Sequence, residues 1–347
     1  MINLFGLLVI FFSSRVKSGV INDEDFPYVS IVISVRNESD NIIDLLNSLG
    51  HLKYPKDKLE ILIGDDHSED DTWRKLKENS KGSNISLYQA KVVDYGKSKM
   101  LDVLCKEAKG EWLLFTDADV RMPEFWVQSM LNQSGDQFAG MTRIIGTRLL
   151  DYFQNIDWLL HQRLIDWYTK IFGPLTIWGN NMAIRKKALE EIEYYKNITN
   201  SIVEDVAVMQ KIKAIGKVTI NNSSGSCVTS LPSRTMSQVI GQRLRWMKGF
   251  SIIEWYILPL CIVKYLYLPS LIYLLIIPDS YIWIAVLITK ALLVFILIEP
   301  YLEGKVLFKK CLALLFFDLY EFLIYFVTFV LSLTTSNVVW KERTYGR

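Results

Sequence analysis

The uneven distribution of apolar residues along the chain most constrains how it can fold. From Asp23 to Phe250 polar and apolar residues alternate as in a soluble domain, whereas Ile252 to Thr335 is dominated by apolar residues. Three apolar stretches in the second region approach the roughly 20 residues that span a bilayer core. They are Tyr256–Ile277, Tyr281–Ile298 and Leu312–Leu333. A soluble domain followed by two to three transmembrane helices is therefore predicted.

The N-terminus contains a shorter apolar run, Ile2–Phe12, followed by Arg15 and Lys17. Because the positive charges follow the run and no small-residue cleavage site is present, a membrane anchor is favoured over a secretory signal. The run is shorter than a membrane span, so we expect the natural start to lie upstream. Since Lys and Arg collect on the cytoplasmic side, the soluble domain is predicted to be cytoplasmic.

The predicted organisation has four parts. They are a short anchor over residues 1–20, a cytoplasmic domain over 21–250, hydrophobic segments over 251–335 and a polar basic tail over 336–347. This describes an integral protein of the inner or plasma membrane. The last apolar stretch contains Asp318 and Glu321, which are costly in lipid. It either crosses the bilayer or lies re-entrant or at the interface, and the sequence leaves both open.

Strand-like and helix-like segments alternate through the mixed region. The β-branched or apolar runs of strand length are Val29–Ser34, Leu59–Gly64, Ile85–Ala90 and Trp112–Thr116. Helices are expected after a Ser39 N-cap, near Thr72, over Lys97–Lys109 and from Pro123. The alternation predicts an α/β fold with a mostly parallel, Rossmann-like sheet. Ligands of such sheets bind at the carboxyl ends of the strands.

Two carboxylates follow the fourth predicted strand, in Asp117-Ala118-Asp119. Such a pair can share a hard divalent cation, Mg²⁺ or Mn²⁺, that bridges to substrate phosphates. A D-x-D arises often by chance, and the alternative is a solvated loop. Asp65-Asp66 follows the second strand and can bind a nucleoside; the alternative is that this segment only caps the next helix, through Ser68 or Asp71.

Further polar residues suit the same chemistry. Asp205 follows Glu204 at a predicted helix start, where a carboxylate is either a general base or a favourable helix-dipole partner. Lys97 can reach phosphate. Trp178, Gly179 and Asn180 form a polar turn that either binds a sugar or is an ordinary turn.

Near the end of the mixed region, Gln242, Arg245 and Trp246 share one helical face. Arg forms forked hydrogen bonds with diphosphate oxygens, and Trp can stack on a sugar. The alternative is a basic helix on anionic lipid with Trp at the interface, a role that Arg243 fits well.

Together these residues resemble the inverting family-two glycosyltransferases of the membrane-bound type, the class containing cellulose synthase and ceramide glucosyltransferase. The matching elements, in order, are Val29–Glu38, Leu59–Thr72, Gly96–Val120, Glu204-Asp205 and Gln242–Trp246, and the tail Trp340–Tyr345 also matches. The resemblance implies a glycosyltransferase-A (nucleotide-diphospho-sugar transferase) fold. It also implies a nucleoside-diphosphate sugar donor, usually a UDP-sugar, with Mg²⁺ or Mn²⁺.

The resemblance also implies roles for individual residues. Glu38 and Asp66 would hold the nucleoside with Asp65 close by, and Asp119 would ligate the metal. Asp117 would face the donor phosphate, the ribose or the metal. Asp205 would be the catalytic base. Gln242, Arg245 and Trp246 would cover the diphosphate and the acceptor entrance, with Arg245 stabilising the leaving group.

Three functions remain open at this point. A single transfer to a lipid-linked acceptor is favoured, because few apolar stretches are available for a polymer channel. A processive polysaccharide synthase, with a partner subunit, is the first alternative, and an inactive membrane scaffold that binds nucleotide sugar is the second. The net charge of +2 gives no reason to expect nucleic acid. The four cysteines lack paired spacing, which predicts reduced, structural thiols.

Overall fold

The structure, a computed structural model, describes residues 26–80, 84–90, 96–196, 198, 203–249, 266–270, 272–273, 276–277, 281–304, 308–335, 338–340 and 343–345. The chain forms two compact units. We call residues 16–142 and 168–230 the sheet unit, and residues 1–15, 143–167 and 231–347 the helical unit. Each is described by itself.

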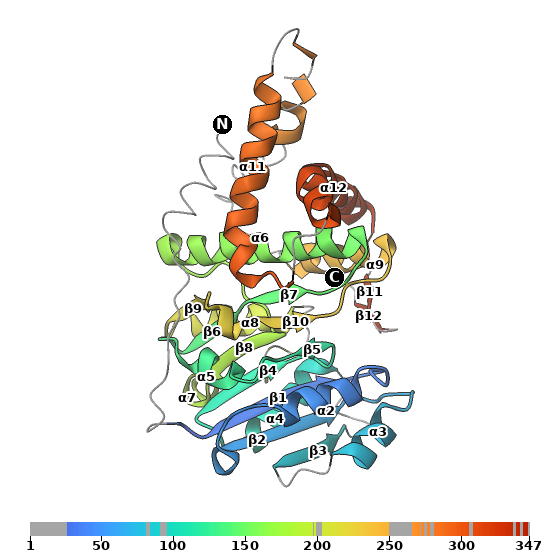
Figure 1. The fold of residues 1–347 in the computed structure, drawn as a ribbon. Helices are drawn as coiled ribbons and strands as arrows, with labels where there is room; N and C mark the ends of the chain where they lie inside the picture. The colour runs from blue at the N-terminus through green and yellow to red at the C-terminus, as the bar shows by residue number, and fades with distance from the viewer. Residues whose placement is uncertain are drawn as a thin grey trace. The chain divides into compact units, whose positions relative to one another are not determined.

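The sheet unit is built on a seven-stranded sheet with the strand order β3-β2-β1-β4-β8-β6-β9. Its strands are β1 (Val29–Val35), β2 (Leu59–Asp65), β3 (Ile85–Gln89), β4 (Trp112–Thr116), β6 (Gln137–Gly140), β8 (Asn181–Arg185) and β9 (Val218–Asn221). Strands β1 to β4 are parallel, β8 runs antiparallel to β4 and β6, and β6 is parallel to β9. The predicted mostly parallel sheet and its first four strands are confirmed (Figure 1).

Helices cover both faces of this sheet because alternate strand residues point to opposite sides. On one face Ile31 and Ile33 of β1 join a core cluster with Leu45 of α2 (Ile42–Gly50) and Trp126 of α5 (Trp126–Leu131). On the other face α4 (Lys97–Glu107) packs closely on β2. The remaining short helices of the unit are η1 (Lys56–Lys58), α3 (Thr72–Asn79), α7 (Lys186–Glu191), α8 (Glu204–Ile212) and η2 (Ser224–Ser226).

Two predicted helix starts differ from the structure. The N-cap of α2 is Asn41, without a side-chain cap. The predicted cap, Ser39, lies in the preceding turn, where its N–H donates to Asp70 Oδ2 at 3.1 Å. Helix α5 begins at Trp126 rather than at Pro123, because the Pro123 carbonyl accepts the Trp126 N–H and closes a turn first.

A short antiparallel pair, β5 (Val120–Arg121) with β10 (Val228–Ser230), lies after β4 and brings Ser230 opposite Val120. The chain passes between the two units within strand β7 (Thr142–Ile144), within helix α6 (Leu149–Phe172) and again directly after Ser230.

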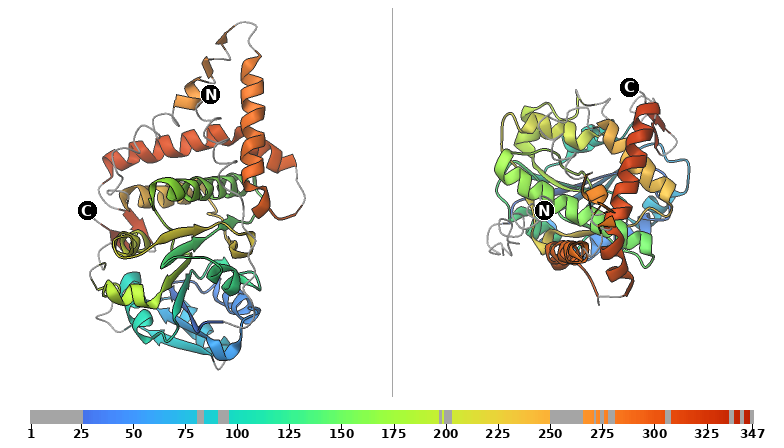
Figure 2. Two further views of the ribbon diagram at one scale, coloured as in Figure 1. Left: turned by 90° about the vertical axis from the view of Figure 1, so that its left-hand side faces the viewer. Right: turned by 90° about the horizontal axis from the view of Figure 1, so that it is seen from above.

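The helical unit consists of most of α6 with α9 (Met236–Gly249), α11 (Ile282–Ile298), η4 (Glu299–Tyr301) and α12 (Phe308–Thr334), followed by the hairpin β11 (Val338–Trp340) and β12 (Arg343–Tyr345). Helix α12 packs on α9 and α11. It crosses α6 (Figure 2). Tyr320 of α12 stacks on Phe153 of α6 with ring centroids 4.7 Å apart. Helices α11 and α12 coincide with two of the predicted apolar stretches.

The carboxylates of α12 face the interior of the helical unit. Asp318 forms an ion pair with Lys290 of α11, and Glu321 lies near His161 of α6. Side chains on the opposite side are apolar and exposed: Leu315, Phe316, Leu319, Leu323, Phe326, Val327, Phe329, Val330 and Leu333. In a soluble protein the apolar side of a helix is buried and its charged side is exposed, whereas α12 has its charged side buried and its apolar side exposed. The ion pair of Asp318 and the burial of Glu321 remove the objection that these carboxylates would contact lipid.

Two helices among the described residues are long and apolar enough to cross a membrane. They are Ile282–Tyr301, with mean hydropathy 2.4, and Phe308–Thr334, with mean hydropathy 2.0. The first predicted stretch, Tyr256–Ile277, lies mostly outside the described residues, as does the whole N-terminal anchor. Of the four cysteines, Cys105, Cys227 and Cys311 are free thiols, and Cys261 lies outside the described residues.

Candidate active site

The carboxyl ends of the parallel strands bring several predicted residues to one edge of the sheet unit. Asp65 is the last residue of β2, and Asp117 directly follows β4. Because β8 runs antiparallel to β4, its first residue Asn181 pairs with Thr116. The turn before β8, with Gly179, therefore reaches the same edge. The antiparallel direction of β8 is therefore the reason that this turn lies at the same edge as Asp117.

Lys97, at the start of α4, joins two carboxylates at this edge. Its Nζ lies 3.0 Å from Asp117 Oδ1 and 3.0 Å from Glu204 Oε1. Burial by itself lowers the pKa of the ammonium, but the two carboxylates outweigh burial and the pKa of Lys97 is raised. Lys97 is therefore a fixed positive charge between the end of β4 and the start of α8.

Asp205 is held at the start of α8 by two backbone amides. Its Oδ2 accepts from the Gly179 N–H at 2.7 Å, and its Oδ1 accepts from the Val206 N–H at 2.8 Å. Burial, and next the charge of Glu204, raise the pKa of Asp205 to about 7, although Lys97 and the two amides act against this rise. A carboxylate with a pKa near neutrality can take up and release a proton at physiological pH.

These side chains line one pocket in the sheet unit. The predicted residues that line it are Lys97, Asp117, Gly179, Glu204 and Asp205. The lining also includes three polar residues that were not predicted, Ser34, Thr116 and Tyr195. The strand-end positions of Ser34 and Thr116 could have identified them. Nothing in the local sequence indicates Tyr195, which is fully buried.

Asp119, the second carboxylate of the Asp-Ala-Asp sequence, lies beside the short β5–β10 pair. Its Oδ2 accepts from the Ser230 hydroxyl at 3.3 Å. Asp117 is 35 % exposed and already faces a cation, the Lys97 ammonium. Two partly exposed carboxylates one residue apart are the hard oxygen donors that Mg²⁺ and Mn²⁺ prefer. The residues present therefore fit a divalent cation.

The acidic residues after β1 and β2 form a second group at the same edge. Asp65 is fully buried, and burial raises its pKa. Asp66 is 2 % exposed, and its Oδ1 accepts from the Gly96 N–H at 3.1 Å. Glu38 Oε2 accepts from the Asn41 side chain at 2.6 Å. None of these three lines the pocket that holds Asp205. His67 is partly buried, with its Nδ1 3.3 Å from Asp66 Oδ1.

The residues of the turn before β8 have different surroundings: Trp178 and Asn180 contact neighbouring strands, and Gly179 lines the pocket. Trp178 is 8 % exposed, and its Nε1–H donates to the Gly140 carbonyl at 2.6 Å. The Asn180 side-chain oxygen accepts from the Thr142 hydroxyl at 3.2 Å. Gly179 lies against Asp205, where a Cβ atom would be 3.3 Å from the Asp205 side chain. Glycine therefore allows the close approach that gives Asp205 its amide hydrogen bond.

The residues Gln242, Arg245 and Trp246 lie on α9 in the helical unit. Trp246 packs edge-on against Trp158 of α6, with ring centroids 5.1 Å apart. The helical position of Arg243 suggested that its side chain would project toward lipid, but the structure buries it. It is 2 % exposed, pairs with Asp157 of α6, and its Cζ lies 4.2 Å from the Trp246 ring centroid. The interior carboxylate explains the difference, because it compensates the buried guanidinium.

Comparison with known proteins identifies the family. The model of "Glycosyl transferase family 2" matches residues 30–193, and that of "Glycosyl transferase family group 2" matches residues 143–336, more than half of the chain. The chain therefore belongs to the family-two glycosyltransferases.

Two curated relatives are similar over about two thirds of this chain. "Probable glycosyltransferase YdaM" of Bacillus subtilis (strain 168) is 28 % identical over 242 residues, covering 66 % of this chain and 56 % of the relative. "Poly-beta-1,6-N-acetyl-D-glucosamine synthase" of Staphylococcus epidermidis is 27 % identical over 228 residues, covering 64 % and 54 %. The chain thus spans just over half the length of these relatives.

The fold is shared with a solved mannosyltransferase from Pyrobaculum calidifontis, whose structure contains GDP-Man and Mn²⁺. The TM-score is 0.55 at 18 % identity, over 92 % of this chain and 96 % of that one. The predicted glycosyltransferase-A fold with its mostly parallel sheet is confirmed. At this identity the likeness extends to the fold alone.

Proposed function

We propose that the protein transfers a sugar from a nucleoside-diphosphate sugar to an acceptor at the membrane, with inversion at the anomeric carbon. The observation that carries this proposal is the Lys97–Asp117–Glu204–Asp205 group, which combines a fixed cation with a carboxylate of near-neutral pKa in one pocket. A transferase needs both, since a diphosphate leaves while an acceptor hydroxyl loses its proton.

Asp205 is the base in this proposal. Its two oxygens are held by the amides of Gly179 and Val206, so the carboxylate is oriented before the acceptor arrives. It removes the proton from the acceptor hydroxyl as that oxygen attacks the anomeric carbon. Glu204 does not act on the substrate itself. It raises the pKa of Asp205 and holds Lys97.

Lys97 and the carboxylates after β4 serve the donor. The Lys97 ammonium, which now pairs with Asp117, would balance negative charge on the diphosphate once Asp117 turns toward the donor. Asp117 and Asp119 would hold Mg²⁺ or Mn²⁺, which when bound neutralises charge on the leaving diphosphate. We further propose that Glu38, Asp65 and Asp66 bind the nucleoside, and that Gln242, Arg245 and Trp246 complete the donor site. Trp178 and Asn180 are proposed to shape the sugar side.

A membrane-associated acceptor is favoured by the two apolar helices, whose exposed side chains suit lipid. We therefore propose an integral membrane protein with the catalytic domain in the cytoplasm. A single transfer to a lipid-linked acceptor is one form of the reaction. The similarity to a poly-β-1,6-N-acetyl-D-glucosamine synthase supports the second form, processive synthesis of a polysaccharide, for which a partner subunit is a reasonable addition.

The test is transfer by purified membranes containing the full chain. A panel of labelled UDP-sugars, with UDP-N-acetylglucosamine first, is offered with Mn²⁺ or Mg²⁺. We expect metal-dependent release of UDP from one donor, and loss of release in Asp119→Ala. Asp57→Asn, an exposed carboxylate outside the pocket, is the matched control and should keep full activity.

The labelled product distinguishes the two forms of the reaction. Extraction into organic solvent with one added sugar indicates a lipid acceptor, whereas a ladder of increasing length indicates a polymer. Binding of nucleotide sugar without release of UDP, in membranes that supply acceptor lipids and a partner subunit, would contradict an active transferase. That result would support the inactive scaffold.

A further inference from the structure

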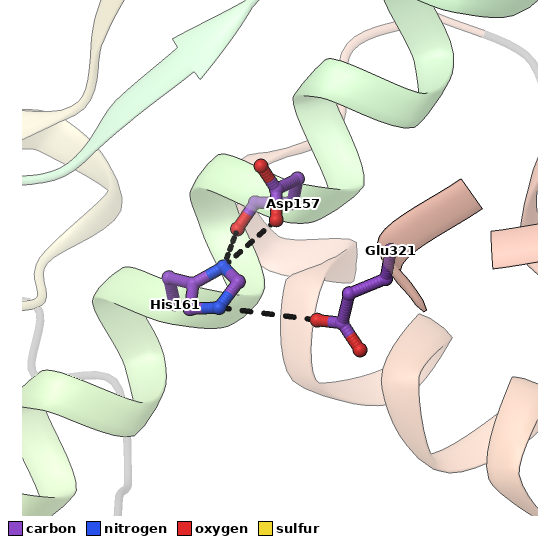
Figure 3. Close-up of side chains that lie close together, drawn as sticks. All are labelled: Asp157, His161 and Glu321. Atoms are coloured by element: carbon purple, nitrogen blue, oxygen red, sulfur yellow. Dashed lines mark hydrogen bonds and ion pairs between the residues drawn. The ribbon is translucent and has the colours of Figure 1, made fainter. Parts of the chain in front are cut away.

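A cluster of metal-ligating side chain types lies in the helical unit, in a different unit from the pocket that contains Asp205. Asp157 and His161 are one turn apart on α6, and Glu321 belongs to α12. Each offers a ligand atom within 4.8 Å of the others. Figure 3 shows the imidazole ring of His161 between the two carboxylates.

The contacts of His161 define which ring nitrogen carries the proton. Its Nδ1 lies 2.7 Å from the backbone carbonyl oxygen of Asp157 and 2.9 Å from Asp157 Oδ1. Both oxygens are acceptors when the carboxylate is ionised, so Nδ1 is the donor. In the neutral imidazole the other nitrogen, Nε2, then presents a lone pair.

That lone pair is directed toward a second acceptor. His161 Nε2 lies 3.8 Å from Glu321 Oε1 (Figure 3). This distance is too long for a hydrogen bond. It matches the separation of two ligands of one ion, because bonds of about 2.0–2.2 Å to a nitrogen and an oxygen place those atoms roughly 3–4 Å apart. A cation near both atoms would turn their repulsion into attraction.

The charge of Asp157 is already compensated within the helical unit. Arg243 pairs with Asp157 Oδ2, and the Tyr325 hydroxyl donates to Asp157 Oδ1 at 3.4 Å. The guanidinium thus compensates the charge of Asp157. The other buried carboxylate of α12, Asp318, is paired with Lys290.

We propose that His161 Nε2 and Glu321 Oε1 are the protein ligands of a divalent transition-metal ion, with water completing its coordination. Imidazole and carboxylate together suit Zn²⁺, Mn²⁺ or Co²⁺. Asp157 is a positioning residue, since it holds the imidazole through Nδ1 in the manner of carboxylate–histidine–metal groups. The His161 side chain is 28 % exposed, which leaves access for the ion and its water. The ion would join α6 to α12, independently of any cation at Asp117 and Asp119.

The test is titration of the metal-stripped full chain, purified in detergent, with Co²⁺, whose visible absorption reports its ligands. His161→Ala and Glu321→Gln remove one ligand each. Asp119→Asn removes the donor-metal site proposed above. His51→Ala is the matched control, because His51 Nδ1 also lies 2.6 Å from the carbonyl four residues earlier but without a carboxylate partner.

We expect the Co²⁺ absorption of this cluster to remain in Asp119→Asn and in His51→Ala, and Co²⁺ binding at this cluster to be at least about tenfold weaker in His161→Ala and Glu321→Gln. Zn²⁺ should raise the melting temperature of the wild type but not of Glu321→Gln, which separates loss of the site from loss of the fold. Unchanged Co²⁺ binding in folded His161→Ala would overturn the proposal. The proposal would also be overturned if the wild-type protein bound no Co²⁺ at this cluster and its His161 were protonated on both ring nitrogens.

Discussion

Replacement of the proposed base should make the stability of the protein less dependent on pH while it abolishes transfer. In Asp205→Asn a neutral amide replaces a carboxylate whose pKa burial and the charge of Glu204 raise to about 7, from an ordinary value of 3.8. Between these two values the folded protein holds a proton that the unfolded chain has released. The stability contributed by this proton is therefore complete at low pH and is lost as the pH rises through 7.

The size of this effect follows from the two pKa values. One pH unit of differential protonation corresponds to about 1.4 kcal/mol. Between pH 5 and pH 8 the wild type should therefore lose on the order of 2–3 kcal/mol of folding free energy from Asp205, which the variant does not lose. For a domain of this size this corresponds to a shift in melting temperature of roughly 5–10 °C.

Melting of the full chain in detergent, followed by tryptophan fluorescence from pH 5 to pH 8, measures this difference. The stability of Asp205→Asn relative to the wild type should increase with pH and become constant above about pH 8. Asp57→Asn, whose side chain is exposed, should show no such growth. A difference between Asp205→Asn and the wild type that stays constant with pH would refute the reasoning.

Three further predictions follow from the same contacts. Transfer should fall about tenfold from pH 8 to pH 6 as Asp205 becomes protonated, measured as initial rates at saturating donor; a flat profile would exclude Asp205 as the titrating base. The midpoint of that profile should move to lower pH in Glu204→Gln, which removes a charge that raises the pKa of Asp205, and to higher pH in Lys97→Met, which removes a charge that lowers it; opposite shifts would contradict the assignment of these charges. Gly179→Ala places a Cβ atom 3.3 Å from the Asp205 side chain and should lower kcat by about tenfold with little change in the KM for donor, whereas unchanged kcat would show that Gly179 does not position Asp205.

The parallel half of the sheet could be predicted from the sequence because most of its strands are predominantly apolar runs between turn residues. Val29–Val35 and Leu59–Asp65 are examples, and both are almost completely buried. Strands β6 and β9 have only four residues each, too few to show a period. The antiparallel placement of β8 depends on pairing with β4, which no local pattern records.

The site could be predicted residue by residue but not as an arrangement. The sequence indicated Lys97, Asp117 and Asp205 separately, each from its position at a strand or helix end. Their meeting in one pocket, and the contribution of Tyr195, depend on contacts between distant segments. Burial of Arg243 was also hidden, because its partner Asp157 lies 86 residues away in the chain. A local pattern shows charge but does not show what compensates it.

The most direct test of the account is a comparison of donor binding and sugar transfer in Asp205→Asn and the wild type at pH 8. Donor affinity is measured by titration with the nucleotide sugar identified in the membrane assay, and transfer is measured in a single turnover. The account predicts donor binding within a few-fold of the wild type and transfer reduced by at least about a hundredfold. Transfer at the wild-type rate by the variant would contradict it.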